Sequence, residues 1–175
     1  ELNTGPISSV VLRDAPTIVS GSIYTIAFNG TDAVGNNATE VSVTGISYVY
    51  TPAAITGTTV TDNNTTIAVT FSEAAYNTSG GSGALEASDF ALSISGGTAT
   101  LSSATPSSIS SSSNTYTLGL SLSGTPNGSE TITVLPSSST AIYDAVGNAA
   151  STSQSNNTVT LNDTTAPAFS SLSWL

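Results

Sequence analysis

The pentapeptide Asp-Ala-Val-Gly-Asn occurs twice in this chain, at positions 32–36 and 144–148. The first copy begins at Asp32 and the second at Asp144, so the repeat has the length of a small domain. Each copy follows an aromatic run of strand-like pattern and precedes a polar, Thr-rich run. An internal repeat with a period as long as a domain indicates an array of related units. The chain is therefore expected to hold parts of more than one such unit.

Residues 53–164 are predicted to form one complete all-β domain. Apolar residues alternate in Ile67, Val69 and Phe71, which is the period-2 pattern of a half-buried strand. Seven such short strands separated by Gly, Pro and Asn turns favour an antiparallel β-sandwich with Greek-key connections. The expected strands are 55–61, 66–72, 90–95, 99–104, 116–123, 131–135 and 158–162. A helical turn is expected in Ala-Leu-Glu-Ala at 84–87, and the Ser-rich stretch 107–113 is expected to be a loop.

Residues 1–52 are predicted to be the C-terminal part of a further domain. The expected strands there are 7–12, 23–28 and 41–50. The last run changes parity at Gly45, which predicts a β-bulge near that residue. Three strands in about 50 residues bury too little surface to stand alone, so the first strands of this domain are expected either to be missing from this sequence or to be supplied by another chain. Residues 165–175 are predicted to be a linker and the first strand of another domain.

The composition excludes several classes of function. Eleven acidic residues face one basic residue, Arg13, for a formal net charge of −10, so nucleic acid is not an expected partner. The chain has no Cys and no His, which removes thiol catalysis, a Ser-His-Asp triad and the usual zinc sites. No apolar run approaches the roughly 20 residues of a membrane span, so membrane insertion is not expected. Charged residues are 7% of the chain, far below the usual figure of about 25%.

Three motifs together carry a resemblance to a known family. They are the repeated pentapeptide, Val-Thr-Phe-Ser-Glu-Ala at 69–74 and Asp-Thr-Thr-Ala-Pro at 163–167. In these the chain resembles bacterial Ig-like tandem repeats of large secreted surface proteins and adhesins. The resemblance implies extracellular Ig-like β-sandwiches in a string, acting as a stalk or filament module. At the first junction the corresponding stretch, Tyr-Val-Tyr-Thr-Pro at 48–52, lacks the acidic residue.

Two interpretations of the repeated pentapeptide remain open from the sequence. In the first it is a tight turn, with the Asp side chain accepting backbone N–H groups and Gly at positive φ. In the second, Asp144 and Asp163 contribute oxygens to a Ca²⁺ ion where two domains meet, and Asp32 is the equivalent of Asp144 in the first copy. No cofactor is required by either interpretation. Neither copy has the dense D-x-D-x-D spacing of a dedicated calcium loop.

The expected function is structural rather than enzymatic. Glu73, Glu86 and Asp89 are the densest acidic neighbourhood, but nothing in the sequence supplies the cleft that a pair of catalytic carboxylates needs. The expected partners are neighbouring repeats and other copies of the chain, with residues 168–175 donating a strand to another copy. The alternative is a module that binds a glycan or a surface through its loops.

Overall fold

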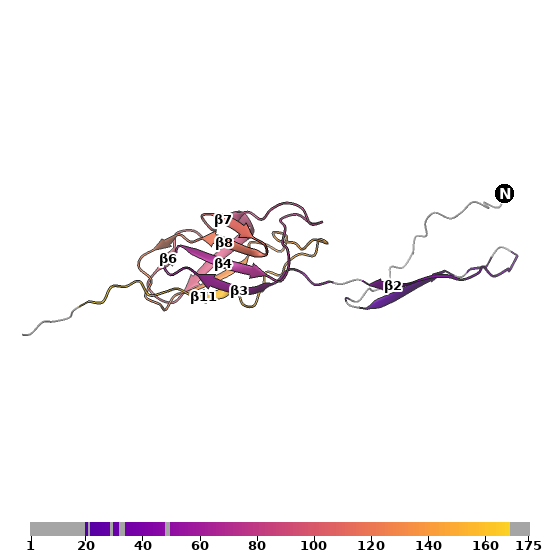
Figure 1. Cartoon of the computed structure of the whole chain (residues 1–175), viewed down its shortest axis with the longest axis horizontal. Helices are drawn as coiled ribbons and strands as arrows, with labels where there is room; N and C mark the ends of the chain where they lie inside the picture. The colour runs from indigo at the N-terminus through magenta and orange to yellow at the C-terminus, as the bar shows by residue number, and fades with distance from the viewer. Residues whose placement is uncertain (1–19, 21, 29, 32–33, 48–49, 169–175) are drawn as a thin grey trace, which may run out of the picture. The chain divides into compact units, whose positions relative to one another are not determined.

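The computed structural model describes residues 20, 22–28, 30–31, 34–47 and 50–168 of the chain (Figure 1). The chain divides into two compact units, residues 1–51 and 52–175, which are called unit 1 and unit 2. The expected strand at 7–12, the side chain of Arg13 and the expected strand at 169–175 lie outside the described residues.

The described part of unit 1 is an antiparallel hairpin of β1 (Ile23–Phe28) and β2 (Val41–Ser47). Tyr24 pairs with Ile46, and Ile26 pairs with Val43, so β2 carries one residue more than β1 between these pairs. Gly45 lies in the extra stretch with φ at +80°, a conformation that L side chains rarely adopt. The predicted bulge near Gly45 is therefore confirmed.

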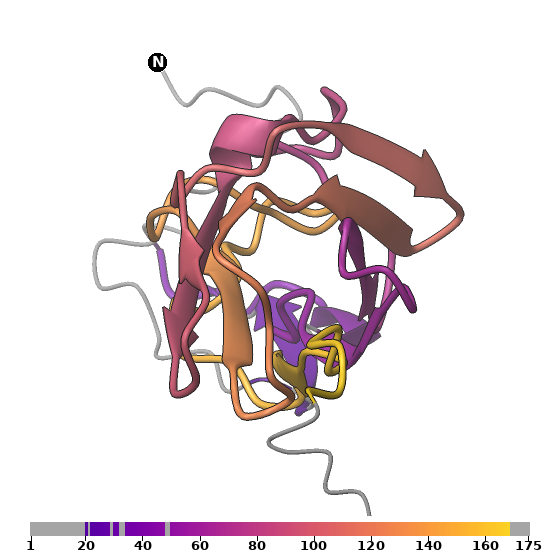
Figure 2. The same ribbon diagram turned by 90° about the vertical axis from the view of Figure 1, so that its left-hand side faces the viewer.

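Unit 2 is a β-sandwich of two antiparallel sheets. The first sheet has the order β3 (Ile55–Val60), β4 (Thr66–Phe71), β8 (Thr115–Gly119) and β7 (Ile109–Ser112). The second has the order β11 (Thr158–Thr160), β10 (Thr131–Pro136) and β5 (Phe90–Ser95). A small pair joins β6 (Thr100–Leu101) to β9 (Leu122–Ser123). Figure 2 looks along the sandwich and shows the two layers facing each other. The buried side chains of both layers form one hydrophobic core.

The core follows from the alternation in the strands. In β4 and β10 every second residue is buried, and Ile67, Val69, Ile132 and Val134 have no exposed surface. Three rings fill the centre of the core: Phe71, Phe90 and Tyr116 have centroids 5.8 to 6.3 Å apart in tilted or edge-to-face arrangements. The prediction of an all-β fold with antiparallel sheets is confirmed. The Ig-like character and the tandem arrangement remain predictions.

Some local expectations differ from the structure. The strand expected at 116–123 is divided into β8 and β9, which pair in different sheets. The Ser-rich stretch 107–113 contains a strand, β7, in which Ile109 pairs with Leu118 and Ser112 pairs with Thr115. Backbone pairing with β8 makes this strand, so its serines need no apolar alternation to be extended. The helical turn lies at Ala87–Asp89 as a 3-10 turn, so it begins where the expected turn would end. It forms there because the Asp89 carboxylate accepts the Glu86 N–H at 2.7 Å.

The chain enters unit 2 at one end of the sandwich and leaves it at the other (Figure 1). β3 begins at Ile55, which pairs with the last residue of β4, Phe71. β11 ends at Thr160, which pairs with the first residue of β10, Thr131. The two ends of unit 2 are called the inlet end, near Ile55, and the outlet end, near Thr160.

Candidate functional site

The second copy of the repeated pentapeptide is a closed turn at the inlet end. Asp144 is 1% exposed, and its Oδ1 accepts the N–H groups of Val146 at 2.9 Å and Asn148 at 2.8 Å. Its Oδ2 accepts the side-chain amide of Asn148 at 2.7 Å. Gly147 has φ at +92°, which suits glycine. The turn interpretation is confirmed for this copy, because each polar residue of the motif contributes to the turn.

Burial and hydrogen bonding act on Asp144 in opposite directions. Burial raises the pKa of its carboxyl, whereas the hydrogen bonds from Asn148 and Val146 lower it, and the net pKa lies below the usual value. The carboxylate is thus held ionised by N–H donors that already occupy both of its oxygens. This arrangement leaves little of the carboxylate available to a metal ion.

The first copy has the same backbone pairing as the second. Thr31 bridges to Asn37 in the first copy, and Tyr143 bridges to Ala149 at the equivalent positions of the second. The Ala38 N–H donates to the Gly30 carbonyl at 2.7 Å, and the equivalent Ala150 N–H donates to the Ile142 carbonyl at 2.8 Å. Gly35 has φ at +93° and Gly147 at +92°. Asp32 itself lies outside the described residues, so its proposed role as an ion ligand remains a prediction.

Asp163 is an exposed residue at the outlet end. Its Oδ1 accepts the Thr165 N–H at 2.8 Å, which forms a local Asx-type turn. The next residues are tied to the loop before β10, because the Thr164 N–H and the Thr165 hydroxyl both donate to the Pro126 carbonyl, at 3.0 and 3.1 Å. Asp163 therefore helps to fix the path by which the chain leaves the sandwich.

The structure does not bring Asp144 and Asp163 together. Tyr143 bridges to Tyr76, just beyond the end of β4, so Asp144 lies at the inlet end. Asp163 follows β11 at the outlet end, with the length of β10 between the two. Within the described ranges, no group of three or more His, Cys, Asp or Glu side chains could hold a metal ion. A Ca²⁺ ion at a junction would accordingly have to draw on only one of these two carboxylates.

A buried carboxylate that sequence reasoning missed lies at the outlet end. Glu130 has no exposed surface; its Oε1 accepts the N–H groups of Thr98 at 2.8 Å and Ala99 at 3.0 Å, and its Oε2 accepts that of Asn127 at 3.0 Å. The bond from Ala99 is the largest influence on its pKa, which these donors lower to about 2. The only sequence signal was an acidic residue directly before an apolar strand. Glu130 thus joins the loop that precedes β6 to the loop that precedes β10.

The acidic neighbourhood of Glu73, Glu86 and Asp89 is partly explained by local structure. Asp89 is engaged with the Glu86 backbone in the 3-10 turn, and Glu86 is exposed. Glu73 is half-buried in the loop after β4. These positions describe a capped loop and do not test whether the chain has enzymatic activity.

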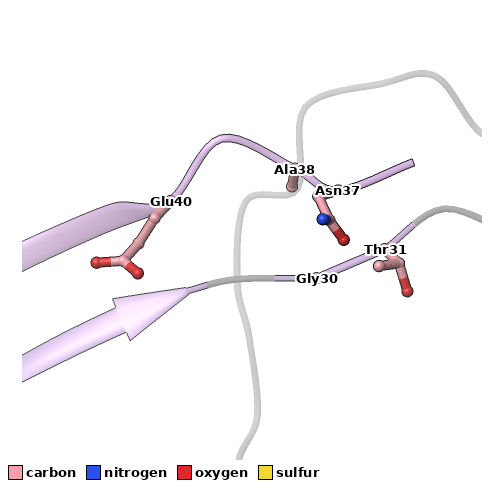
Figure 3. A pocket seen from close by; sticks show the side chains of 5 residues that line it. All are labelled: Gly30, Thr31, Asn37, Ala38 and Glu40. Atoms are coloured by element: carbon pink, nitrogen blue, oxygen red, sulfur yellow. The ribbon is translucent and has the colours of Figure 1, made fainter. Parts of the chain in front are cut away.

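The described residues form hollows on the hairpin of unit 1 and at the inlet end of unit 2. One, of about 540 Å³, lies along the hairpin of unit 1 and is lined by Gly30, Thr31, Asn37, Ala38 and Glu40. Figure 3 shows its side chains spread along the hairpin, with the Glu40 carboxylate apart from Asn37 and Thr31. The other, of about 330 Å³, lies at the inlet end between residues 81–85, Tyr76 and Tyr116. Burial raises the pKa of Tyr116, whose hydroxyl donates to the Ala75 carbonyl at 3.0 Å.

No family model, curated protein or solved structure matches the chain. The resemblance to bacterial Ig-like repeats thus remains an interpretation of the sequence. In the described part of the chain, no helix is long and apolar enough to cross a membrane.

Proposed function

We propose that this chain is a structural repeat segment of a large extracellular bacterial surface protein, acting as a stalk or filament module. The observation that carries this proposal is the recurrence of one hairpin turn in the two copies of the pentapeptide, with the same bridge, the same backbone hydrogen bond and the same positive-φ glycine. A unit whose chain enters at one end and leaves at the other can be strung end to end.

The polar groups of unit 2 support a structural role. Asp144, Glu130 and Asp163 each accept backbone N–H groups from their own unit. Their hydrogen-bonding capacity goes to fixing loops rather than to a ligand. The scarcity of charged residues and the lack of Cys also fit a module that serves as a durable spacer outside the cell.

Changing the number of repeats in the parent protein tests this function. Duplicating residues 53–164 should move the distal end of the protein away from the cell by one repeat length. Immunogold labelling of a distal tag on intact cells measures that displacement. The proposal would be contradicted if the distance from the cell to the tag does not change. It would also be contradicted if the antibody reaches the tag only after the cells are opened.

Strand donation between copies is the second part of the proposal. The hairpin of unit 1 exposes apolar side chains on one face: Ile26 is 58%, Val41 66% and Val43 57% exposed. A face of this kind suits completion by a further strand. Residues 168–175 are the proposed donor, and positions 169–175 lie outside the described residues. If the chain lacking 168–175 associates to the same degree as the full chain in analytical ultracentrifugation, donation by this strand is excluded.

The hollow at the inlet end favours an alternative, a module that binds a glycan or a surface through its loops. Tyr76 offers aromatic surface there, beside the buried Tyr116, and Ser82 and Ser111 offer hydroxyl groups. A glycan array probed with the chain and with Tyr76→Ala addresses this function. Binding that the substitution abolishes would favour it over a purely structural role.

A further inference from the structure

The first and last strands of unit 2, β3 and β11, lie side by side but belong to different sheets (Figure 1). Both strands are fully described, and no backbone ladder joins them. Side chains make the connection instead. The line of contact between β3 and β11, with the residues that flank them, is called the terminal seam.

Hydrogen bonds cross the terminal seam at three levels. Near the inlet end, the Ile55 N–H donates to Gln154 Oε1 at 2.9 Å. In the middle, the Thr58 hydroxyl donates to the Thr158 carbonyl at 2.8 Å. Near the outlet end, Asn64 and Asn162 bond reciprocally: Asn64 Nδ2 donates to the Asn162 carbonyl at 2.8 Å, and the Asn162 N–H donates to Asn64 Oδ1 at 2.9 Å.

Burial, backbone conformation and hydrogen bonds together fix the side chain of Asn64 at this position. It is 3% exposed, has φ at +56°, and is bonded through both atoms of its side-chain amide. Asparagine tolerates this left-handed conformation better than most residues. Asn162 adds a further bond from its own side chain to the Thr61 carbonyl at 3.1 Å.

The two strands of the seam run in the same direction. Residues at the start of β3 contact the segment before β11, as the Ile55–Gln154 bond shows. The segment after β3 contacts the segment after β11, as the Asn64–Asn162 pair shows. Tension applied to the two ends of unit 2 would consequently pull β3 toward the inlet end and β11 toward the outlet end.

We propose that the terminal seam is the part of unit 2 that resists tension, with Asn64 as its principal residue. Pulling the ends slides β3 along β11, so the bonds at all three levels resist together instead of opening one after another. Forced unfolding is governed by the barrier to unfolding, which such simultaneous loading raises. The inference rests on the proposed stalk function only for the origin of the force; the seam itself is a property of this chain.

Single-molecule pulling on the full chain tests the proposal. The chain has no Cys, so Thr51→Cys and Ala168→Cys, both at exposed positions, attach handles on either side of the sandwich. In this background Asn64→Gly keeps the positive φ and removes only the side chain. It should unfold about tenfold faster than the unsubstituted domain at the same constant force, since the hydrogen bonds of the Asn64 side chain across the seam are lost.

Asn156→Gly is the matched control. Asn156 also has φ at +56°, but only its backbone carbonyl contacts the seam, so glycine there removes no side-chain bond across it. It should unfold within about twofold of the unsubstituted domain. Thr58→Val, which removes one donor from the seam, is a second test variant and should lie between the two glycine variants.

A second pair of handles separates resistance to tension from general stability. Ser112 ends β7 in one sheet, and Ser139 lies in the loop that follows β10 of the other sheet, both at the inlet end. Handles at Ser112→Cys and Ser139→Cys therefore pull the sheets apart without sliding β3 along β11. With these handles Asn64→Gly and Asn156→Gly should unfold at similar rates. The inference would be overturned if Asn64→Gly speeds unfolding equally with both pairs of handles. It would also be overturned if Asn64→Gly does not speed unfolding when the handles are at residues 51 and 168. Either result leaves the stalk proposal to its own test in cells.

Discussion

Acidic side chains in unit 2 organise its loops by accepting backbone N–H groups. Glu130 ties the loop at 96–99 to the turn at 126–130, and Gly97 must be glycine there because an added Cβ would lie 2.1 Å from the Glu130 carboxyl carbon. Asp144 closes the turn at 144–148 in the same way. At the scale of single residues, the carboxylates of Glu130 and Asp144 hold the loops of unit 2 in place.

Replacing Glu130 by Gln should lower the melting temperature clearly, as followed by circular dichroism at pH 7. The amide nitrogen of Gln would face N–H donors that now bond to a carboxylate oxygen, leaving them without an acceptor. Asp62→Asn is the matched control, since it removes one negative charge at an exposed position. Equal melting temperatures for the two variants would show that the Glu130 contacts contribute nothing.

Stability should also depend on pH through Glu130. Its pKa is about 2 in the folded state against 4.5 as the reference value, so the unfolded chain binds the proton more readily. The stabilisation is therefore complete above about pH 4.5 and is lost as the pH falls toward 2. The difference in melting temperature between the wild type and Glu130→Gln should shrink across this window. A difference that stays constant from pH 7 to pH 2.5 would contradict this assignment.

At the scale of the element, the hairpin turn of the repeated pentapeptide depends on its glycine. Gly147→Ala should destabilise unit 2 by about 1–3 kcal/mol, because L residues are strained at positive φ. The added Cβ would also lie 2.6 Å from Ser79 Oγ. Denaturant unfolding measures the loss, and Gly57→Ala, which meets nothing within 4 Å, is the control. If both substitutions cost the same, the turn does not need its glycine.

Calcium should have no effect on the melting temperature of the chain. The oxygens of Asp144 already accept three N–H groups, and Asp163 is engaged with Thr165. A ligand that binds only the folded state would raise the melting temperature. Scanning calorimetry with excess chelator and with added Ca²⁺ makes the comparison. An increase with Ca²⁺ that Asp163→Asn removes would assign an ion to the outlet end.

Elements with their own sequence signal could be predicted from the sequence. Alternation in Ile67, Val69 and Phe71 marks β4, and the parity change at Gly45 marks the bulge in β2. The serines of β7 carry no such signal, because their strand is made by pairing with β8. Glu130 and the Asn64–Asn162 pair could not be found either. Glu130 is bonded to the distant Thr98 and Ala99, and Asn64 is bonded to the distant Asn162. Nothing local in the sequence indicates such contacts.

At the scale of the whole molecule, unit 2 has the features of a module for end-to-end connection. Its chain enters and leaves at opposite ends, and the outlet segment is bonded to the loop before β10. In unit 1 the equivalent segment is held similarly, since the Tyr50 N–H donates to the Ser20 hydroxyl at 2.6 Å. Short outlet segments, each hydrogen-bonded to its own unit, would favour a stiff array of units over a flexible one.

Small-angle X-ray scattering on arrays of residues 52–168 tests the proposed stalk most directly. Arrays with one, two and four copies in tandem are compared under the same conditions. A stalk module predicts a maximum dimension that grows in proportion to the number of copies. Growth close to the square root of the copy number, as for freely jointed domains, or collapse to a compact particle would contradict it.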